Sequence, residues 1–84
     1  MSKVTVKYRS GLAETVGKTE EIIPADSVAD VLKYIKANYG RDAYRTARAM
    51  VIAVNEVGIL KLRVFKTALE DGDVVQFLPI AGGG

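Results

Sequence analysis

Alternating polar and apolar residues open the chain and predict a half-buried strand at residues 3–9. A shorter run of the same kind predicts a second strand at residues 19–23, which Pro24 ends. Between them, Ser10-Gly11 indicates the start of a loop and Gly17-Lys18 indicates a turn. We therefore expect the chain to begin with a hairpin of two strands.

Apolar residues at helical spacing predict a helix that begins after Asp26-Ser27 and stops at Gly40. Either Asp26 or Ser27 can accept hydrogen bonds from the free N–H groups of the first turn, and Asp30 adds a favourable charge there. A further helical segment is expected at residues 41–49. The buried face of the main helix is predicted to carry Val28, Val31, Leu32, Ile35 and Tyr39.

The second half of the chain has the pattern of strands and turns. A continuous apolar run at residues 50–54 predicts a buried central strand, followed by a turn at residues 55–58 and a short strand at residues 59–62. Residues 69–73 form a second expected turn, whose glycine suits a positive φ angle. Residues 74–80 give the last strand.

This order of elements predicts an α+β fold in which a mixed sheet wraps around one main helix. In the last strand, Val75 and Phe77 should point into the core, so that Leu78 and Ile80 lie outside. Exposed apolar side chains beside a chain end often mark a partner surface. The alternative is that residues 58–68 fold over them. The helix should pack against Val4, Val6, Ile52 and Val54.

The chain ends in Ala81-Gly82-Gly83-Gly84, directly after the last strand. Glycine adopts almost any backbone conformation, so we expect a flexible tail at residues 81–84 behind a domain at residues 1–80. The five residues past Pro79 can extend about 17 Å. That length would bring the carboxylate of Gly84 into a partner's active site. The alternative is an ordinary frayed terminus.

The composition excludes most kinds of catalytic and metal-binding site in the chain itself. There is no Cys and no His, which excludes thiolate, imidazole and disulfide chemistry and the usual zinc or haem sites. Glu20 and Glu21 are adjacent and point to opposite sides of a strand, so they form no carboxylate pair. We therefore expect no active site and no metal site.

Charge and hydropathy narrow the class of partner. The net charge of +2 arises from interleaved residues, which favours neither nucleic acid nor a membrane surface as a partner. Arg41, Arg45 and Arg48 fall at helical spacing, and a solvated helix face is the preferred interpretation of this basic stripe. With no apolar run of transmembrane length and no leader pattern, the expected location is the cytoplasm.

Three stretches of the chain resemble the β-grasp, ubiquitin-like sulfur carriers, above all the small subunits of molybdopterin synthase. Residues 27–32 resemble that family's helix start, and residues 51–55 resemble its central strand and Asn turn. Residues 69–84 resemble its ending, with a Leu-x-Asp-Gly-Asp turn, an apolar strand with Phe and Pro, and terminal glycines. The resemblance covers essentially the whole chain and implies a ubiquitin-like β-grasp fold.

The resemblance also implies which residues act. Gly83 and Gly84 match the family's diglycine, and Gly82 replaces the small or hydroxyl residue usual before it. Ile80 stands where a second proline is common, and residues 58–66 diverge from the family pattern. The residues expected to contact the partners are Leu78, Pro79, Ile80 and Ala81.

In such carriers, as the resemblance implies, the carboxylate of Gly84 is activated by a partner, because a carboxylate is a poor electrophile. A ubiquitin-activating-enzyme-like adenylyltransferase would use ATP to form an acyl-adenylate. A sulfur donor such as a cysteine desulfurase or a rhodanese would then leave a C-terminal thiocarboxylate. The large subunit of molybdopterin synthase would use that sulfur for molybdenum or tungsten cofactor synthesis. The chain would be a non-catalytic subunit that binds no cofactor.

Other functions stay open at this point, and two of them need the same tail. They are sulfur donation for thiamine or for tRNA thiolation, and a ubiquitin-like modifier conjugated through Gly84. A third class is a β-grasp interaction module whose glycines have no role. Residues 40–50 resemble the extra segment of the molybdopterin type, which favours that assignment.

Overall fold

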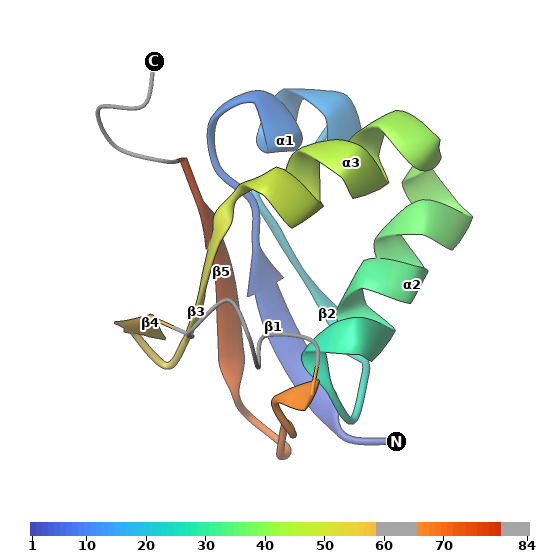
Figure 1. The fold of residues 1–84 in the computed structure, drawn as a ribbon. Coiled ribbons are helices and arrows are strands. Elements are labelled where there is room, and N and C mark those ends of the chain that lie inside the picture. The colour runs from blue at the N-terminus through green and yellow to red at the C-terminus, as the bar shows by residue number, and fades with distance from the viewer. Residues whose placement is uncertain (59–65, 80–84) are drawn as a thin grey trace.

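The computed structural model describes residues 1–58 and 66–79. Within this part, five strands form one mixed sheet in the order β2-β1-β5-β3-β4 (Figure 1). The helices and strands are β1 (Lys3–Lys7), α1 (Ser10–Val16), β2 (Glu20–Pro24), α2 (Val28–Tyr39), α3 (Arg41–Ala49), β3 (Val51–Val54), β4 (Val57–Gly58) and β5 (Val74–Leu78).

The predicted N-terminal hairpin is confirmed, since β1 and β2 pair antiparallel with Val4 opposite Ile23. β1 ends at Lys7, two residues earlier than expected. The pairing nevertheless continues for one more hydrogen bond, because the Tyr8 N–H donates to the Thr19 carbonyl at 2.8 Å.

The last strand, β5, lies in the middle of the sheet. It runs parallel to β1, with Val6 opposite Val75, and antiparallel to β3, with Ile52 opposite Phe77. The C-terminal end of β5 therefore lies beside the C-terminal end of β1, where the chain turns into α1 (Figure 1). This pairing fixes where the tail begins.

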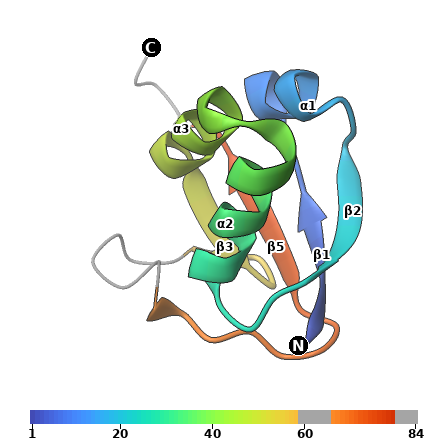
Figure 2. The same cartoon turned by 90° about the vertical axis from the view of Figure 1, so that its right-hand side faces the viewer.

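The helices cover one face of the sheet, and α2 forms the main layer of the core (Figure 2). The Ser27 side chain caps α2 by accepting from the Asp30 N–H at 3.3 Å, and Gly40 follows the helix at φ 95°. The predicted packing is confirmed: α2 contributes Val28, Val31, Leu32 and Ile35 to a core that also holds Val4, Val6 and Ile52, with Val54 packed partly buried against it.

The loop predicted between the first two strands is wrong, because that segment folds as α1. Leu12 and Val16 lie one turn apart and are both buried in the core. Gly17 ends the helix at φ 85°, and its N–H donates to the Ala13 carbonyl at 2.8 Å. An apolar pair at helical spacing was thus present, but Ser10-Gly11 before it had the composition of a loop.

The remaining expectations have mixed outcomes. The helix predicted at residues 41–49 is present as α3. The expected turn at residues 55–58 is partly wrong, since Val57–Gly58 pair with β3 as the short strand β4. The strand expected at residues 59–62 lies outside the described residues. The last strand ends at Leu78 rather than two residues later.

Candidate functional site

The base of the predicted tail is the end of β5, held between β1 and β3. Leu78 is half-buried and pairs with Val51 of β3, whose side chain is 38% exposed. Pro79 follows and is exposed. The other predicted site residues, Ile80 to Gly84, lie outside the described residues. The structure therefore places the surface from which the tail starts.

The inner face of β5 anchors this base firmly. Val75 and Phe77 are fully buried, which confirms the prediction that they point into the core. The Phe77 ring stacks on the Tyr8 ring, with centroids 6.3 Å apart and an interplanar angle of 14°. Because aromatic pairs of this kind add to the burial energy, the end of β5 is fixed to the end of β1.

The turn before β5 sets the start of the strand. Gly72 has φ 86°, as predicted, and the Asp73 carboxylate accepts from the Glu70 N–H at 2.9 Å. This hydrogen bond lowers the pKa of Asp73 below its usual value. Asn55 joins β3 to this turn: its side-chain amide donates to Asp73 at 3.0 Å and accepts from the Val74 N–H at 2.9 Å. Sequence reasoning identified the Asn turn but missed its side-chain bonds.

The outer face of the sheet carries a shallow hollow of about 290 Å³. It combines one cation, one anion, two amides and apolar surface, so it has the mixed character of a protein contact surface rather than of a catalytic centre. Its lining residues are Lys7, Asn55, Glu56, Val74 and Gln76.

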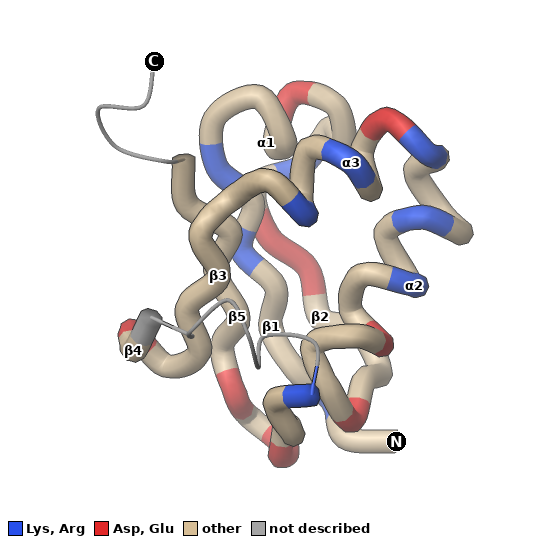
Figure 3. Tube along the Cα trace, viewed as in Figure 1, with Lys and Arg blue, Asp and Glu red and all other residues tan. Residues whose placement is uncertain are grey.

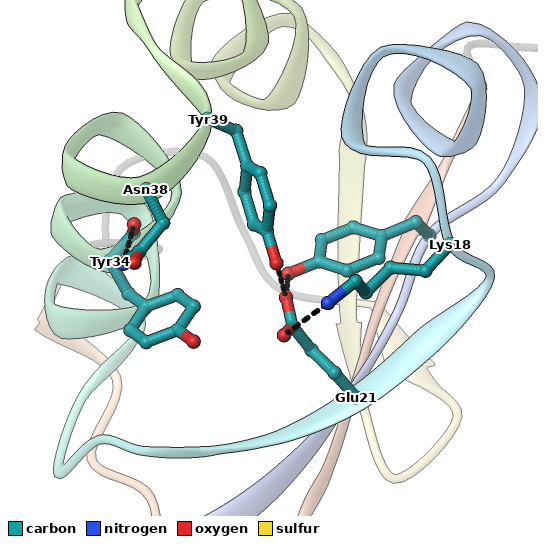
Figure 4. Close-up of polar contacts among 6 residues, drawn as sticks. Lys18, Glu21, Tyr34, Asn38 and Tyr39 are labelled. Carbon is teal, nitrogen blue, oxygen red and sulfur yellow. Dashed lines mark hydrogen bonds and ion pairs between the residues drawn. The ribbon is translucent and has the colours of Figure 1, made fainter.

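A cluster of polar side chains joins β2 to the end of α2 (Figure 4). The hydroxyls of Tyr8 and Tyr39 each donate to Oε2 of Glu21 at 2.6 Å, and Lys18 Nζ lies 3.4 Å from Oε1. Burial, with the neighbouring Glu21, raises the pKa of Tyr8 and that of Tyr39 above their usual values. Both phenols therefore stay protonated as donors, and this cluster stabilises the fold.

Sequence reasoning missed this cluster, although it placed Glu20 and Glu21 on opposite sides of a strand. The structure confirms that separation, with Glu20 exposed and Glu21 turned toward α2. Among residues 1–58 and 66–79, no group of three or more carboxylates could hold a metal ion. In the same part of the chain, no helix is long and apolar enough to cross a membrane.

A mixed sheet that wraps a main helix, with the last strand in its centre and a small-residue tail behind it, defines a ubiquitin-like β-grasp protein. The sequence profile of the ThiS family matches residues 6–84. The chain therefore belongs to the ThiS family, the β-grasp sulfur carriers.

Solved structures with the same fold belong to several kinds of small protein. The small archaeal modifier protein 1 (SAMP1) of Methanosarcina acetivorans is 26% identical, with a TM-score of 0.83, covering 100% of this chain and 98% of its own. The putative molybdopterin converting factor, subunit 1, of Pyrococcus furiosus is also 26% identical, with a TM-score of 0.71 and coverages of 94% and 98%.

A third similar structure is a complex of subunits 1 and 2 of the molybdopterin-converting factor from Helicobacter pylori, at 22% identity. Its TM-score is 0.68, covering 98% of this chain and 99% of that one, and at this identity it supports the fold alone. A search of curated protein sequences gave no match. Modifiers and molybdopterin factors thus share this fold, and family membership alone does not choose between them.

Proposed function

We propose that this chain carries sulfur as a thiocarboxylate on Gly84 and donates it in molybdopterin biosynthesis. The observation that carries the proposal is the ThiS-family match, which runs through the terminal glycines to Gly84. The 26% identity to a putative molybdopterin converting factor subunit 1 supports the choice of pathway.

The position of β5 supports this role. Strand β5 pairs with β1 on one side and with β3 on the other, and its inner face packs against the core. The tail therefore starts from a strand whose position is fixed. A rigid base limits the positions that a tail can reach and so lowers the entropy lost when the tail enters a channel. Partner contacts are proposed at Leu78 and Pro79, continuing through Ile80 and Ala81 to Gly82 and Gly83.

The chemistry needs partners, because the chain has neither Cys nor His. In the proposed reaction, an adenylyltransferase joins the Gly84 carboxylate to AMP from ATP and releases pyrophosphate. A sulfur nucleophile then displaces AMP. The large subunit of molybdopterin synthase is the proposed partner that receives the tail and uses its sulfur, by analogy with the complex of subunits 1 and 2 from Helicobacter pylori. ATP belongs to the activating partner, and this chain is the non-catalytic carrier.

A second candidate is a ubiquitin-like modifier conjugated through Gly84. The observation that favours it is the similarity to SAMP1, with a TM-score of 0.83 over the whole chain. Both functions begin with the same acyl-adenylate and differ in the nucleophile, which is sulfur in one and a lysine amine in the other. Sulfur donation for thiamine or tRNA thiolation would follow the first route.

The test is a reconstituted reaction of the purified chain with an activating enzyme, a sulfur source and the large subunit. Deleting Gly83 and Gly84 should abolish adenylation while the circular dichroism spectrum stays unchanged. The matched control is Gly82→Ser, which keeps the length and places the family's usual kind of residue there; it should retain activity. Sulfur transfer by the shortened chain would refute the proposal.

Intact mass of the protein from its native host separates the two candidates. Replacement of one terminal oxygen by sulfur indicates the carrier. Tryptic digestion cuts after Lys66, so residues 67–84 attached to lysines of other proteins, without any thiocarboxylate form, would instead establish the modifier and exclude sulfur donation.

A further inference from the structure

Basic residues gather at the end of the molecule where the tail begins (Figure 3). On α3, Arg41, Arg45 and Arg48 are exposed, and their spacing places them on one face over about 10 Å of helix. Arg48 lies three residues before Val51, which pairs with Leu78. The basic face of α3 therefore ends next to the last described pair of β5.

A further arginine lies on the other side of β5. Arg9 is exposed and directly follows Tyr8, whose ring stacks on Phe77. Since β5 lies between β1 and β3, the start of the tail has Arg9 on the β1 side and Arg48 on the β3 side.

Two of the cations are held in place by an aromatic ring. Lys36 Nζ lies 5.2 Å from the ring centroid of Tyr44, and the guanidinium carbon of Arg48 lies 5.5 Å from it. Tyr44 itself packs against the core. Cation–π contacts of this kind restrict long side chains before any partner arrives, which reduces the entropy lost on binding.

Two arginines of this surface, Arg41 and Arg45, are not paired with a carboxylate of the described residues within 4 Å. Glu14 and Asp42 are the acidic residues of α1 and α3, against five cations at this end. We call these five the exit-side basic surface: Arg9, Lys36, Arg41, Arg45 and Arg48.

The acidic residues at the opposite end of β5 have structural partners. Asp26 accepts from the Ser2 N–H at 2.8 Å, Asp71 accepts from the Lys3 N–H at 2.7 Å, and Asp73 accepts from the turn before β5. These carboxylates hold the N-terminus and the turn together. The opposite charges are thus separated along the direction of β5, which gives the molecule an oriented electric field.

We propose that the exit-side basic surface docks on an acidic surface bordering the channel through which the activating enzyme admits the tail. This inference rests on the proposed function, since it requires that Gly84 enter a partner's active site. The field orients the chain with its tail toward the partner, so that the basic surface speeds productive encounters. The chemistry at the tail is left to the activating enzyme.

A protein partner fits this surface better than RNA does. The surface begins beside the start of the tail, at Arg9 and Arg48, and extends along α3, so a protein that receives the tail can also contact it. Its cations lie on α2, on α3 and in the connection between β1 and α1, and they are interrupted by Glu14 and Asp42. RNA-binding surfaces instead present longer continuous basic tracks with aromatic side chains free to stack on bases. Here the aromatic ring of Tyr44 is occupied by the protein's own cations.

The experiment measures association of the chain with the ATP-dependent activating enzyme of the same genome by stopped flow. The double variant Arg41→Glu/Arg45→Glu should associate about tenfold more slowly than the wild type at about 0.1 M salt. The difference should vanish near 1 M salt, where the screening length is about 3 Å. Because the surface acts on docking, the variant should also raise the concentration of chain that gives half-maximal adenylate formation.

The matched control is Lys3→Glu/Lys66→Glu, which makes the same change of net charge away from the tail and should leave association nearly unchanged. Equal slowing by both double variants would show that only net charge matters and would overturn the proposal, as would no slowing by either. Binding of a tRNA probe that is lost in Arg41→Glu/Arg45→Glu, with unchanged protein association, would overturn it in favour of RNA. If the wild type forms no adenylate, the proposed function itself fails.

Discussion

The side chain of Glu21 joins several elements of the fold. Its carboxylate accepts from tyrosines of the β1 end and of α2, and it pairs with Lys18 between α1 and β2. The side chain of Tyr8 is almost fully buried, and burial together with Glu21 raises the pKa of its hydroxyl. The folded state therefore holds the Tyr8 proton more tightly than the unfolded state does.

This raised pKa sets the sign of the pH dependence at alkaline pH. The unfolded chain loses the tyrosine proton as pH rises through about 10, while the folded chain keeps it. The contribution of Tyr8 to stability is therefore complete below about pH 10 and is lost as pH rises further.

Replacing Tyr8→Phe should destabilise the protein by about 1.5–3 kcal/mol at neutral pH, since a hydrogen bond to a charged group is removed. It should also make the loss of stability above pH 10 less steep. Urea unfolding across this pH range measures both effects. Tyr34→Phe is the control, because no hydrogen bond of the Tyr34 hydroxyl occurs among the described residues. An alkaline slope identical to that of the wild type would contradict the role assigned to Tyr8.

At the scale of elements, α2 and the sheet depend on each other for burial. The apolar face of α2 is almost completely removed from water, and β1, β3 and β5 supply the other side of the core. A single helix of this length has little stability in water by itself, so packing against the sheet provides most of it.

We expect Leu32→Ala on α2 to destabilise the fold by about 2–5 kcal/mol, because a buried side chain is replaced by a cavity. Leu32 is 2% exposed, whereas its neighbour Lys33 is exposed. Lys33→Ala is therefore the control and should change stability by less than about 0.5 kcal/mol. Denaturant midpoints measure both, and equal midpoints for the two variants would mean that α2 is not part of the core.

At the scale of the whole molecule, the fold presents two separate features at one end: a central strand that leads into the tail and a basic surface that begins beside it. The apolar part of this end is formed by Leu78 and Val51 on the outer face of the sheet. Leu78 is half-buried rather than fully outside, so part of the residue packs against the sheet and part is exposed.

Under the proposed function, Leu78→Asp should weaken binding to the activating enzyme and to the large subunit, because both proposed partners would contact the domain beside the tail. Ile22→Asp is the control: Ile22 is 69% exposed and lies on the edge strand β2, which β1 separates from β5. Titration calorimetry with purified partners, on variants shown to be folded by circular dichroism, measures the effect. Unchanged affinity of Leu78→Asp for both partners would place the docking surface elsewhere.

Local patterns in the sequence determined the main helix, the hairpin, the final turn and the inward face of β5. Each of these depends on residues close together in the chain: the stripe from Val28 to Ile35, the Ser27 cap, Gly72 at positive φ, and the alternation around Phe77. The terminal glycines are equally local, and with the final turn they indicated the family that the profile match confirms.

Tertiary structure decided what local patterns left open. Helix α1 is too short to be stable alone, and it forms because Leu12 and Val16 complete the core. The parallel pairing of β5 with β1 joins residues about seventy positions apart and puts Arg9 beside the start of the tail, and the antiparallel pairing of β5 with β3 puts Arg48 there. The Glu21 cluster likewise needs three elements to meet. Such contacts depend on which elements pack against each other. A local sequence pattern shows which face of one element is apolar but not which other element covers that face.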